Sequence, residues 1–182
     1  ILNPANGAPI TVPAQDMVLG LYYITKLRKG AKGEGLTFYG PEEALIAYNE
    51  GKVDIHAIIN VVAKDLDENG NIVDKMIKET SVGRVIVNEI VPAEVGYLNT
   101  IISKKSLRDI ISDVIKAVGV ARACEFLDGI KNLGYKMAFE GGLSFNLGDI
   151  IIPKEKEELV KRGHEEIEQI MMNYNMGFIT DN

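Results

Sequence analysis

The sequence has few of the residues that disulfides and transition-metal sites require. One of its 182 residues is cysteine, Cys124, so an internal disulfide is excluded. Two histidines, His56 and His164, and that single cysteine are too few for a credible transition-metal site, so we predict no metal site. Cys124 falls in an apolar helical pattern, which predicts a buried structural thiol rather than a nucleophile.

The sequence also lacks long apolar runs and an excess of positive charge. No apolar run approaches the length that a bilayer requires, so we predict no membrane contact. The net charge is -6, whereas a free-standing nucleic-acid-binding protein usually has a basic patch or a high pI. Any role beside nucleic acid is therefore expected to depend on a larger assembly. Because the sequence begins without an initiator methionine or a signal-peptide pattern, we expect it to be part of a longer protein.

What the sequence does contain predicts an α+β fold, with packed helices beside an antiparallel β-hairpin. Apolar residues recur at helical spacing in residues 14–29, 41–50, 103–118 and 120–140. Ser103 is the expected N-cap of the third of these helices, and Gly119 is its expected end. Alternating residues between 53 and 80 flank Asn69-Gly70, a strong hairpin-turn signal. Residues 82–91 fit a strand or a helix equally well.

A last helix is predicted from Lys154 onward. Val160, Ile167 and Tyr174 recur every seven residues, as in the seam of a coiled coil. Such a seam needs a partner helix, and none follows within the chain. We therefore expect a protruding C-terminal helix over residues 153–182, appended to a domain over residues 1–152.

No spacing in the sequence predicts a catalytic site. The segment Gly30–Gly35 lacks the phosphate-loop pattern, so a surface loop is the simpler interpretation, although Lys32 could contact a phosphate if the loop faced one. His164-Glu165 lacks the second histidine of a zinc-binding helix. On residue types alone, a free-standing protein-interaction or nucleotide-binding module stays open as an alternative.

Eight short segments, in order, carry a resemblance to a known family. They are residues 3–7 (Asn-Pro-Ala-Asn-Gly), 13–16, 19–25, 31–35, 80–84, 90–92, 104–106 and 149–154. The sequence closely resembles the beta′ (largest) subunit family of bacterial DNA-directed RNA polymerase, in the region that follows its catalytic aspartates. The resemblance covers nearly the whole chain.

This resemblance implies that residues 1–152 are the pore domain, which lines the secondary channel of the polymerase. Nucleoside triphosphates enter by that channel, and backtracked RNA leaves by it. The position of Gln15 implies a polar contact at the active-site end, and Asp16 follows more weakly. Lys32 and Arg84 are the candidate basic contacts to nucleotide in the channel.

Residues 153–182 resemble the first arm of the funnel (rim) helical hairpin at the outer mouth of the channel. Gre-type cleavage factors or related coiled-coil regulators dock there in the family. The candidate docking residues in this sequence are Glu158, Lys161, Glu165 and Glu168. The resemblance further implies the beta, alpha and omega subunits as partners and a cytoplasmic, nucleoid-associated location.

The resemblance places the chemistry of this nucleotidyltransferase outside the chain. The magnesium-binding aspartates of the family precede the matched region, so no catalytic residue is predicted here, and the chain alone is expected to be inactive. Some relatives build an alarmone site partly from the region matching residues 119–132. Ala121 and Asn132 replace the usual lysine and tyrosine, so no alarmone site is predicted.

Overall fold

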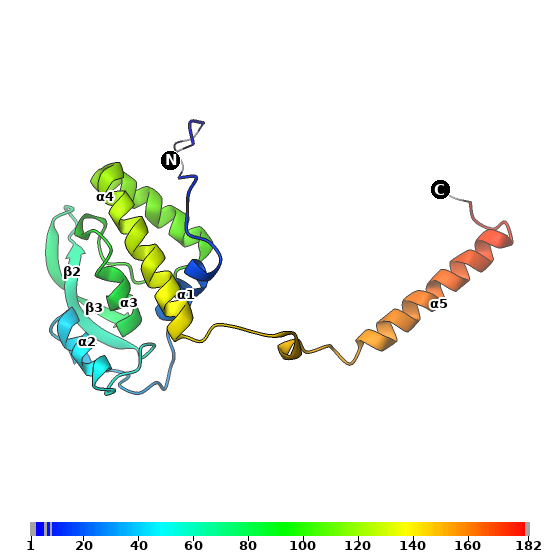
Figure 1. Cartoon of the computed structure of the whole chain (residues 1–182), viewed down its shortest axis with the longest axis horizontal. Coiled ribbons are helices and arrows are strands. Elements are labelled where there is room, and N and C mark those ends of the chain that lie inside the picture. Colours follow the sequence, from blue (N-terminus) through cyan, green and yellow to red (C-terminus); the bar gives the residue numbers. More distant parts are fainter. Residues whose placement is uncertain (1–2, 6, 8, 181–182) are drawn as a thin grey trace. The chain divides into compact units, whose positions relative to one another are not determined.

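The α+β prediction is confirmed by a computed structural model, which describes residues 3–5, 7 and 9–180. Within these residues there are five α-helices and one three-stranded sheet (Figure 1). In chain order they are α1 (Asp16–Thr25), β1 (Thr37–Phe38), α2 (Pro41–Asn49), β2 (Ile59–Leu66), β3 (Ile72–Thr80), α3 (Val82–Asn88), α4 (Lys104–Glu140) and α5 (Lys156–Asn175), with short 3-10 helices η1 (Ala93–Val95) and η2 (Leu147–Asp149).

The chain divides into two compact units, Ile1–Leu143 and Ser144–Asn182. The first contains the sheet and helices α1 to α4, and the second contains η2 and α5. The boundary that the sequence predicts between residues 152 and 153 therefore lies inside the second unit. No described residue of the second unit is buried, so all of the core described here belongs to the first.

The predicted hairpin forms two of the three strands of the sheet, in which β2 is central. Strands β2 and β3 pair antiparallel from Ile59 opposite Thr80 to Leu66 opposite Ile72, and β1 adds a parallel edge. The carboxylate of Asp67 organises the turn, because it accepts the main-chain N–H groups of Asn69 and Asn71 at 2.8 and 2.7 Å. Strand β2 begins at Ile59, later than the predicted start at residue 53.

Of the ambiguous residues 82–91, Val82–Asn88 form the short helix α3 and the remaining three form a turn. Its N-cap Ser81 decides between the two possibilities, since its side chain accepts the main-chain N–H of Arg84 at 3.2 Å. Val82 and Val85 pack in the core beneath the sheet, while Val87 packs in the core between α1 and α4. Helix α3 thus joins the two halves of the first unit.

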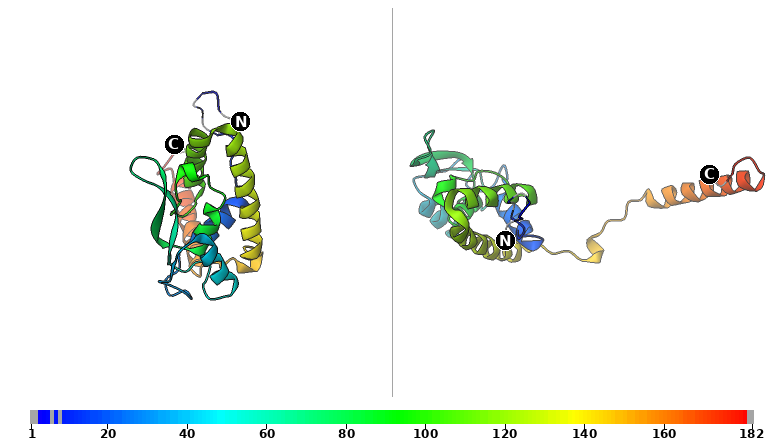
Figure 2. Two further views of the ribbon diagram at one scale, coloured as in Figure 1. Left: turned by 90° about the vertical axis from the view of Figure 1, so that its left-hand side faces the viewer. Right: turned by 90° about the horizontal axis from the view of Figure 1, so that it is seen from above.

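The two helices predicted between residues 103 and 140 meet directly at Gly119. This glycine has φ 77° and ψ 174°, so the helical path breaks there, and α4 has two limbs that Figures 1 and 2 show meeting at an apex. The predicted N-cap is confirmed: Ser103 and Ser106 form a reciprocal capping box.

Two predictions about the helices are wrong. Helix α1 ends at Thr25 rather than at residue 29, because Lys26 is extended and Arg28 joins Ala57 in a parallel bridge. Cys124 is exposed rather than buried. The inward positions of its helical limb are Ala123, Phe126, Ile130, Leu133, Gly134 and Met137, and Cys124 lies one residue beyond that series.

Glycines allow α1 to approach both of its neighbours closely. A Cβ built on Gly20 would lie 1.9 Å from the carbonyl oxygen of Gly134 in α4. A Cβ built on Gly83 in α3 would lie 1.9 Å from the carbonyl oxygen of Ile24. Both obstacles are backbone atoms, which cannot move aside as a flexible side chain would.

We expect Gly20→Ala to lower the free energy of unfolding of the first unit by about 1–3 kcal/mol or more, because the added methyl group would force α1 and α4 apart. Urea unfolding of the purified chain, followed by circular dichroism, measures this change. Gly163→Ala is the matched control. It adds the same methyl group to α5 with nothing within 4 Å. An equal midpoint for Gly20→Ala and the control would contradict this packing.

Candidate functional site

A hollow opens beside the start of α1. It has a volume of about 370 Å³ and is lined by α1 together with the start of α4. The lining residues are Gln15, Val18, Leu19, Tyr22, Ser103 and Lys104. The hollow therefore joins two segments that are far apart in the sequence, and it contains the first site residue that the sequence predicts.

Gln15 has a strained backbone at the edge of this hollow. Its φ of 50° and ψ of -121° lie in a region that residues other than glycine rarely adopt, at a cost of about 1–3 kcal/mol. Its side chain is exposed and makes no capping hydrogen bond with α1. The side-chain amide, which can both donate and accept, is thus available to a ligand.

Positive charge gathers at the start of α4, which forms one wall of the hollow through Ser103 and Lys104. Lys104, Lys105 and Arg108 lie in the first two turns of α4, and all three are exposed. The N-terminal end of a helix also carries a partial positive charge, so this wall favours an anion. Sequence reasoning used Lys104 and Lys105 only as part of the resemblance and missed them as site residues. Their position directly after the predicted cap Ser103 was the available signal.

Arg84, a predicted channel contact, lies inside the first unit. It is 5% exposed, and its guanidinium donates to the carbonyl oxygen of Thr25 at 3.0 Å. It also donates to the main-chain and side-chain oxygens of Asn99 at 3.0 and 2.8 Å. Burial lowers the pKa of Arg84 below its ordinary value, partly offset by Tyr97. These contacts make Arg84 a structural anchor and leave little of its guanidinium accessible to a ligand.

Thr25 connects this anchor to the start of α4. Its hydroxyl donates to the carbonyl oxygen of Leu21 at 2.7 Å and accepts the main-chain N–H of Ile102 at 3.0 Å. Ile102 immediately precedes the cap Ser103. The hydrogen bonds of Arg84 and Thr25 therefore set where Lys104 lies relative to α1.

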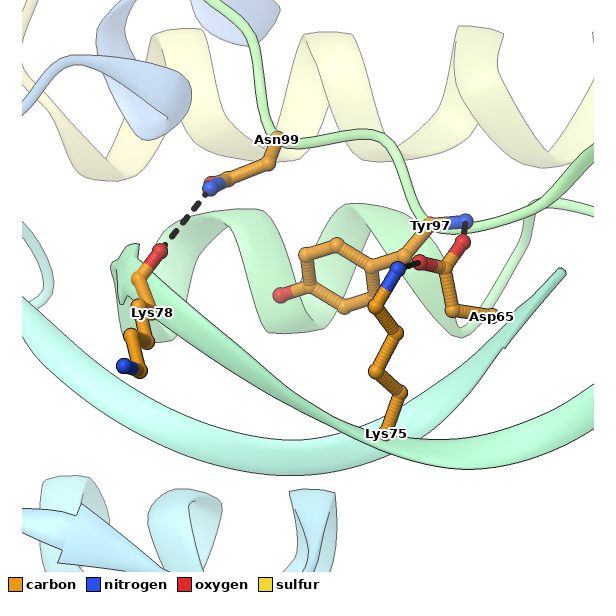
Figure 3. A network of polar contacts seen from close by, with 5 residues as sticks. All are labelled: Asp65, Lys75, Lys78, Tyr97 and Asn99. Atoms are coloured by element: carbon orange, nitrogen blue, oxygen red, sulfur yellow. Dashed lines mark hydrogen bonds and ion pairs between the residues drawn. The ribbon is translucent and has the colours of Figure 1, made fainter. Parts of the chain in front are cut away.

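Figure 3 shows how the segment that leads to α4 is held against the sheet. The carboxylate of Asp65 accepts the main-chain N–H of Tyr97 at 3.0 Å and pairs with Lys75 at 3.3 Å. The side-chain amide of Asn99 donates to the carbonyl oxygen of Lys78 at 3.2 Å. Strands β2 and β3 thus support the same segment that Arg84 holds from the helical side.

The other two predicted channel residues are exposed but lie at different places. Asp16 follows Gln15 directly, in the first turn of α1. Lys32 lies in the loop beyond the other end of α1, where its carbonyl oxygen accepts the main-chain N–H of Asp54 at 2.9 Å. The structure therefore places Asp16, but not Lys32, next to the hollow.

The four predicted docking residues lie on α5 and are exposed. Glu158, Lys161, Glu165 and Glu168 share one side of the helix at 3.6 residues per turn. Val160, Ile167, Met171 and Tyr174, which are also exposed, fall on a different side. Lys161 and Glu165 form an exposed ion pair at 3.9 Å, whose stabilising effect is small.

The part of the chain that the structure describes contains neither a metal-binding cluster nor a membrane-spanning helix. In residues 3–5, 7 and 9–180 no group of three histidine, cysteine, aspartate or glutamate side chains is arranged to hold a metal ion. Within the same residues, no helix combines the length and apolar character that crossing a membrane requires.

Comparison with known proteins identifies the family. The family described as RNA polymerase Rpb1, domain 3, matches residues 1–150. The DNA-directed RNA polymerase subunit beta′ of Phocaeicola vulgatus is 94% identical over 182 residues, which is 100% of this chain and 13% of that relative. The chain belongs to the RNA polymerase beta′ subunit family. The corresponding subunit of Parabacteroides distasonis is 74% identical over 182 residues, again 100% of this chain and 13% of the relative.

The similarity extends to more distant beta′ subunits. That of Flavobacterium johnsoniae is 52% identical over 187 aligned residues, covering 100% of this chain and 13% of its own length. The chain described here therefore spans about an eighth of the length of these relatives. The hollow and the cations at the start of α4 correspond to one segment of those longer subunits.

Tyr97 is predicted to make the stability of the chain depend on pH in the alkaline range. Burial is the main cause that raises the Tyr97 pKa from 10.0 to about 12. Between these values the folded chain keeps a proton that the unfolded chain has lost, so stability present below pH 10 is lost as the pH rises toward 12.

We expect the free energy of unfolding to fall by up to about 1.4 kcal/mol per pH unit in this window on account of Tyr97. Tyr97→Phe should remove that part of the slope, because it keeps the ring and removes the titrating hydroxyl. Urea unfolding at several alkaline pH values, with tyrosinate absorbance as a second readout, measures it. Equal slopes for the two chains would show that Tyr97 titrates normally.

Proposed function

We propose that the first unit forms part of the wall of the nucleotide-entry channel of DNA-directed RNA polymerase. The observation that carries this proposal is the hollow in which the strained, exposed Gln15 lies beside Lys104 at the start of α4. In the whole enzyme this hollow faces incoming nucleoside triphosphate near the active-site end of the channel. The family membership and the resemblance of residues 13–16 support this placement.

The wall acts by charge and hydrogen bonding rather than by covalent chemistry. Lys104, Lys105 and the N-terminal end of α4 attract the negatively charged triphosphate, which raises its local concentration. The amide of Gln15 then offers one donor and one acceptor to an oriented nucleotide. Asp16 repels phosphate from the start of α1 and so favours approach along the basic wall.

Magnesium and the bond-forming step belong to other parts of the enzyme in this proposal. The described residues contain no cluster of carboxylates that fits a magnesium ion, so no catalytic step is assigned to them. When bound elsewhere in the enzyme, magnesium would neutralise the charge that develops on the transferred phosphate. The beta′ chain contributes delivery and orientation of the substrate.

The second unit presents a docking surface in the same proposal. Glu158, Lys161, Glu165 and Glu168 form a charged side of α5 that Gre-type cleavage factors or related coiled-coil regulators contact. The apolar side of α5 is left for a partner helix of the funnel hairpin. The proposal also includes assembly with the beta, alpha and omega subunits. The proposed location is the cytoplasm, in association with the nucleoid.

We expect Gln15→Ala in the assembled polymerase to raise the KM for nucleoside triphosphates about fivefold, since one hydrogen bond contributes about 1 kcal/mol. Steady-state elongation on a defined template measures KM and the elongation rate. Gln15→Gly separates side chain from backbone, because it removes the amide and also relieves the positive φ. Equal effects of both variants assign the loss to the amide, and an unchanged KM and rate in Gln15→Ala would remove Gln15 from the channel.

We expect the double change Glu165→Lys and Glu168→Lys to weaken cleavage-factor binding about fivefold per charge at low salt, and less at high salt. Fluorescence anisotropy of a labelled cleavage factor titrated with assembled polymerase measures the affinity. Glu166→Lys is the matched control, since it changes the same charge on another side of α5 and breaks the exposed pair with Arg162. An affinity that falls equally for the control, or that does not fall, would rule out this side as the docking surface.

A further inference from the structure

A groove opens beside β2, the central strand of the sheet. It has a volume of about 400 Å³ and is lined by β2, the start of α2, the end of α3 and the segment around η1. Figure 1 labels α2, β2 and α3, which contact one another around it. The groove shares no lining residue with the hollow that contains Gln15, and its volume is within the range of ligand-binding clefts.

The groove lies along an edge of β2 that has no neighbouring strand. The pairing of β1 with β2 ends at Phe38, whereas β2 continues to Leu66. The main-chain N–H of Asn60 donates to the carbonyl oxygen of Leu36 at 2.9 Å, so it points to the β1 side. Because the main-chain groups of a strand point to alternate edges, those of Lys64 point to the same side, where β1 has ended. Lys64 lines the groove, which therefore includes a free edge of the sheet.

The side chains that line the groove are of two kinds. Ala63, Val85 and Val91 are apolar and are 6%, 2% and 9% exposed, so they offer a surface for a small or apolar side chain. Tyr39, which directly follows β1, is 85% exposed. Its ring is available to stack on a bound group or to contact a cation.

Negative charge is in excess around the groove. Lys64 and Asp74 lie directly opposite each other on β2 and β3, so their charges offset each other. Glu42, in the first turn of α2, and Glu89, at the C-terminal end of α3, are exposed. Within the described part of the chain neither of these two forms an ion pair. The partial negative charge at the end of α3 adds to that of Glu89, so the groove favours a cation.

We propose that the groove receives an extended segment that carries a lysine or an arginine and is contributed by another part of the assembled polymerase. The segment adds to β2 in line with β1, and its main chain pairs with that of Lys64. Its cation pairs with Glu42 or Glu89 beside the ring of Tyr39. A polypeptide fits better than a free small molecule, because a sheet edge offers main-chain partners along the direction of a strand.

The source of the segment is the rest of the enzyme. The chain covers 13% of the length of the subunit from Phocaeicola vulgatus, so most of a subunit of that length is available to supply it.

The first test replaces Tyr39 by the photo-crosslinking amino acid benzoylphenylalanine in the assembled polymerase. Mass spectrometry of the irradiated enzyme maps the product. The expected result is a link to a segment outside residues 1–182 that has a lysine or arginine within two residues of the linked position. The same amino acid at Glu68, an exposed residue of the hairpin turn, is the control that should not give this product. The absence of a protein product, a linked segment without a basic residue, or the same product from the control would each overturn the proposal.

The second test removes the two carboxylates with Glu42→Gln and Glu89→Gln in the polymerase that carries the cross-linker. The yield of the product should fall by up to about fivefold for each carboxylate, and it should depend less on salt than before. The control, Glu68→Gln with Asp109→Asn, removes equal charge from exposed positions that do not line the groove. An unchanged yield, or an equal loss in the control, would show that charge does not select the segment.

The third test compares Lys64→Pro with Lys64→Gln in the same polymerase. Both variants remove the ammonium group, but only proline removes the main-chain N–H that points into the groove, and an edge position tolerates this loss. We expect a lower yield of the product for proline than for glutamine, and equal yields would overturn the addition of a strand. None of these outcomes depends on the KM for nucleotides, so this proposal and the channel wall can fail separately.

Discussion

The buried guanidinium of Arg84 is the interaction on which the site depends. Burying a charge is unfavourable unless its donors find acceptors, and the three oxygens of Thr25 and Asn99 supply them. Those acceptors lie at the end of α1 and just before α4, so satisfying one side chain fixes both segments. The buried contacts of Arg84 with Thr25 and Asn99 therefore help to set the distance between Gln15 and Lys104, although these two residues lie at the surface.

Close glycine contacts make that arrangement rigid. Gly20 lets α1 touch the backbone of α4, and Gly83 lets α3 touch the backbone of α1. At these two points no side chain separates the helices, so a movement that brought them closer would make main-chain atoms overlap. The strain in the backbone of Gln15 can persist on such a base, since the surrounding structure holds α1 at both ends.

Local signals predicted the elements, but not which of them meet. Pro41, Asn69-Gly70 and Ser103 each specify a helix start or a turn through a contact within a few residues, and each prediction is confirmed. Burial depends on partners distant in sequence. The sequence therefore predicted a buried Cys124, which is exposed, and gave no sign that Arg84, a candidate nucleotide contact, is buried. That Gln15 and Lys104 line the same hollow could not be predicted either, because no local sequence pattern indicates that the starts of α1 and α4 lie together.

The net charge of a sequence is likewise a poor guide to phosphate binding, because the arrangement of charges depends on the fold. A total of -6 argues against contact with phosphate if the charge is treated as uniform, but interactions between exposed charges are largely screened beyond about 8–10 Å at physiological salt. A phosphate near Lys26 or Lys104 responds mainly to the charges that lie within that distance. What matters to a ligand is therefore how the fold segregates charge. In this chain seven of the exposed cations form two clusters: Lys104, Lys105 and Arg108 at the start of α4, and Lys26, Arg28, Lys29 and Lys32 just beyond the end of α1.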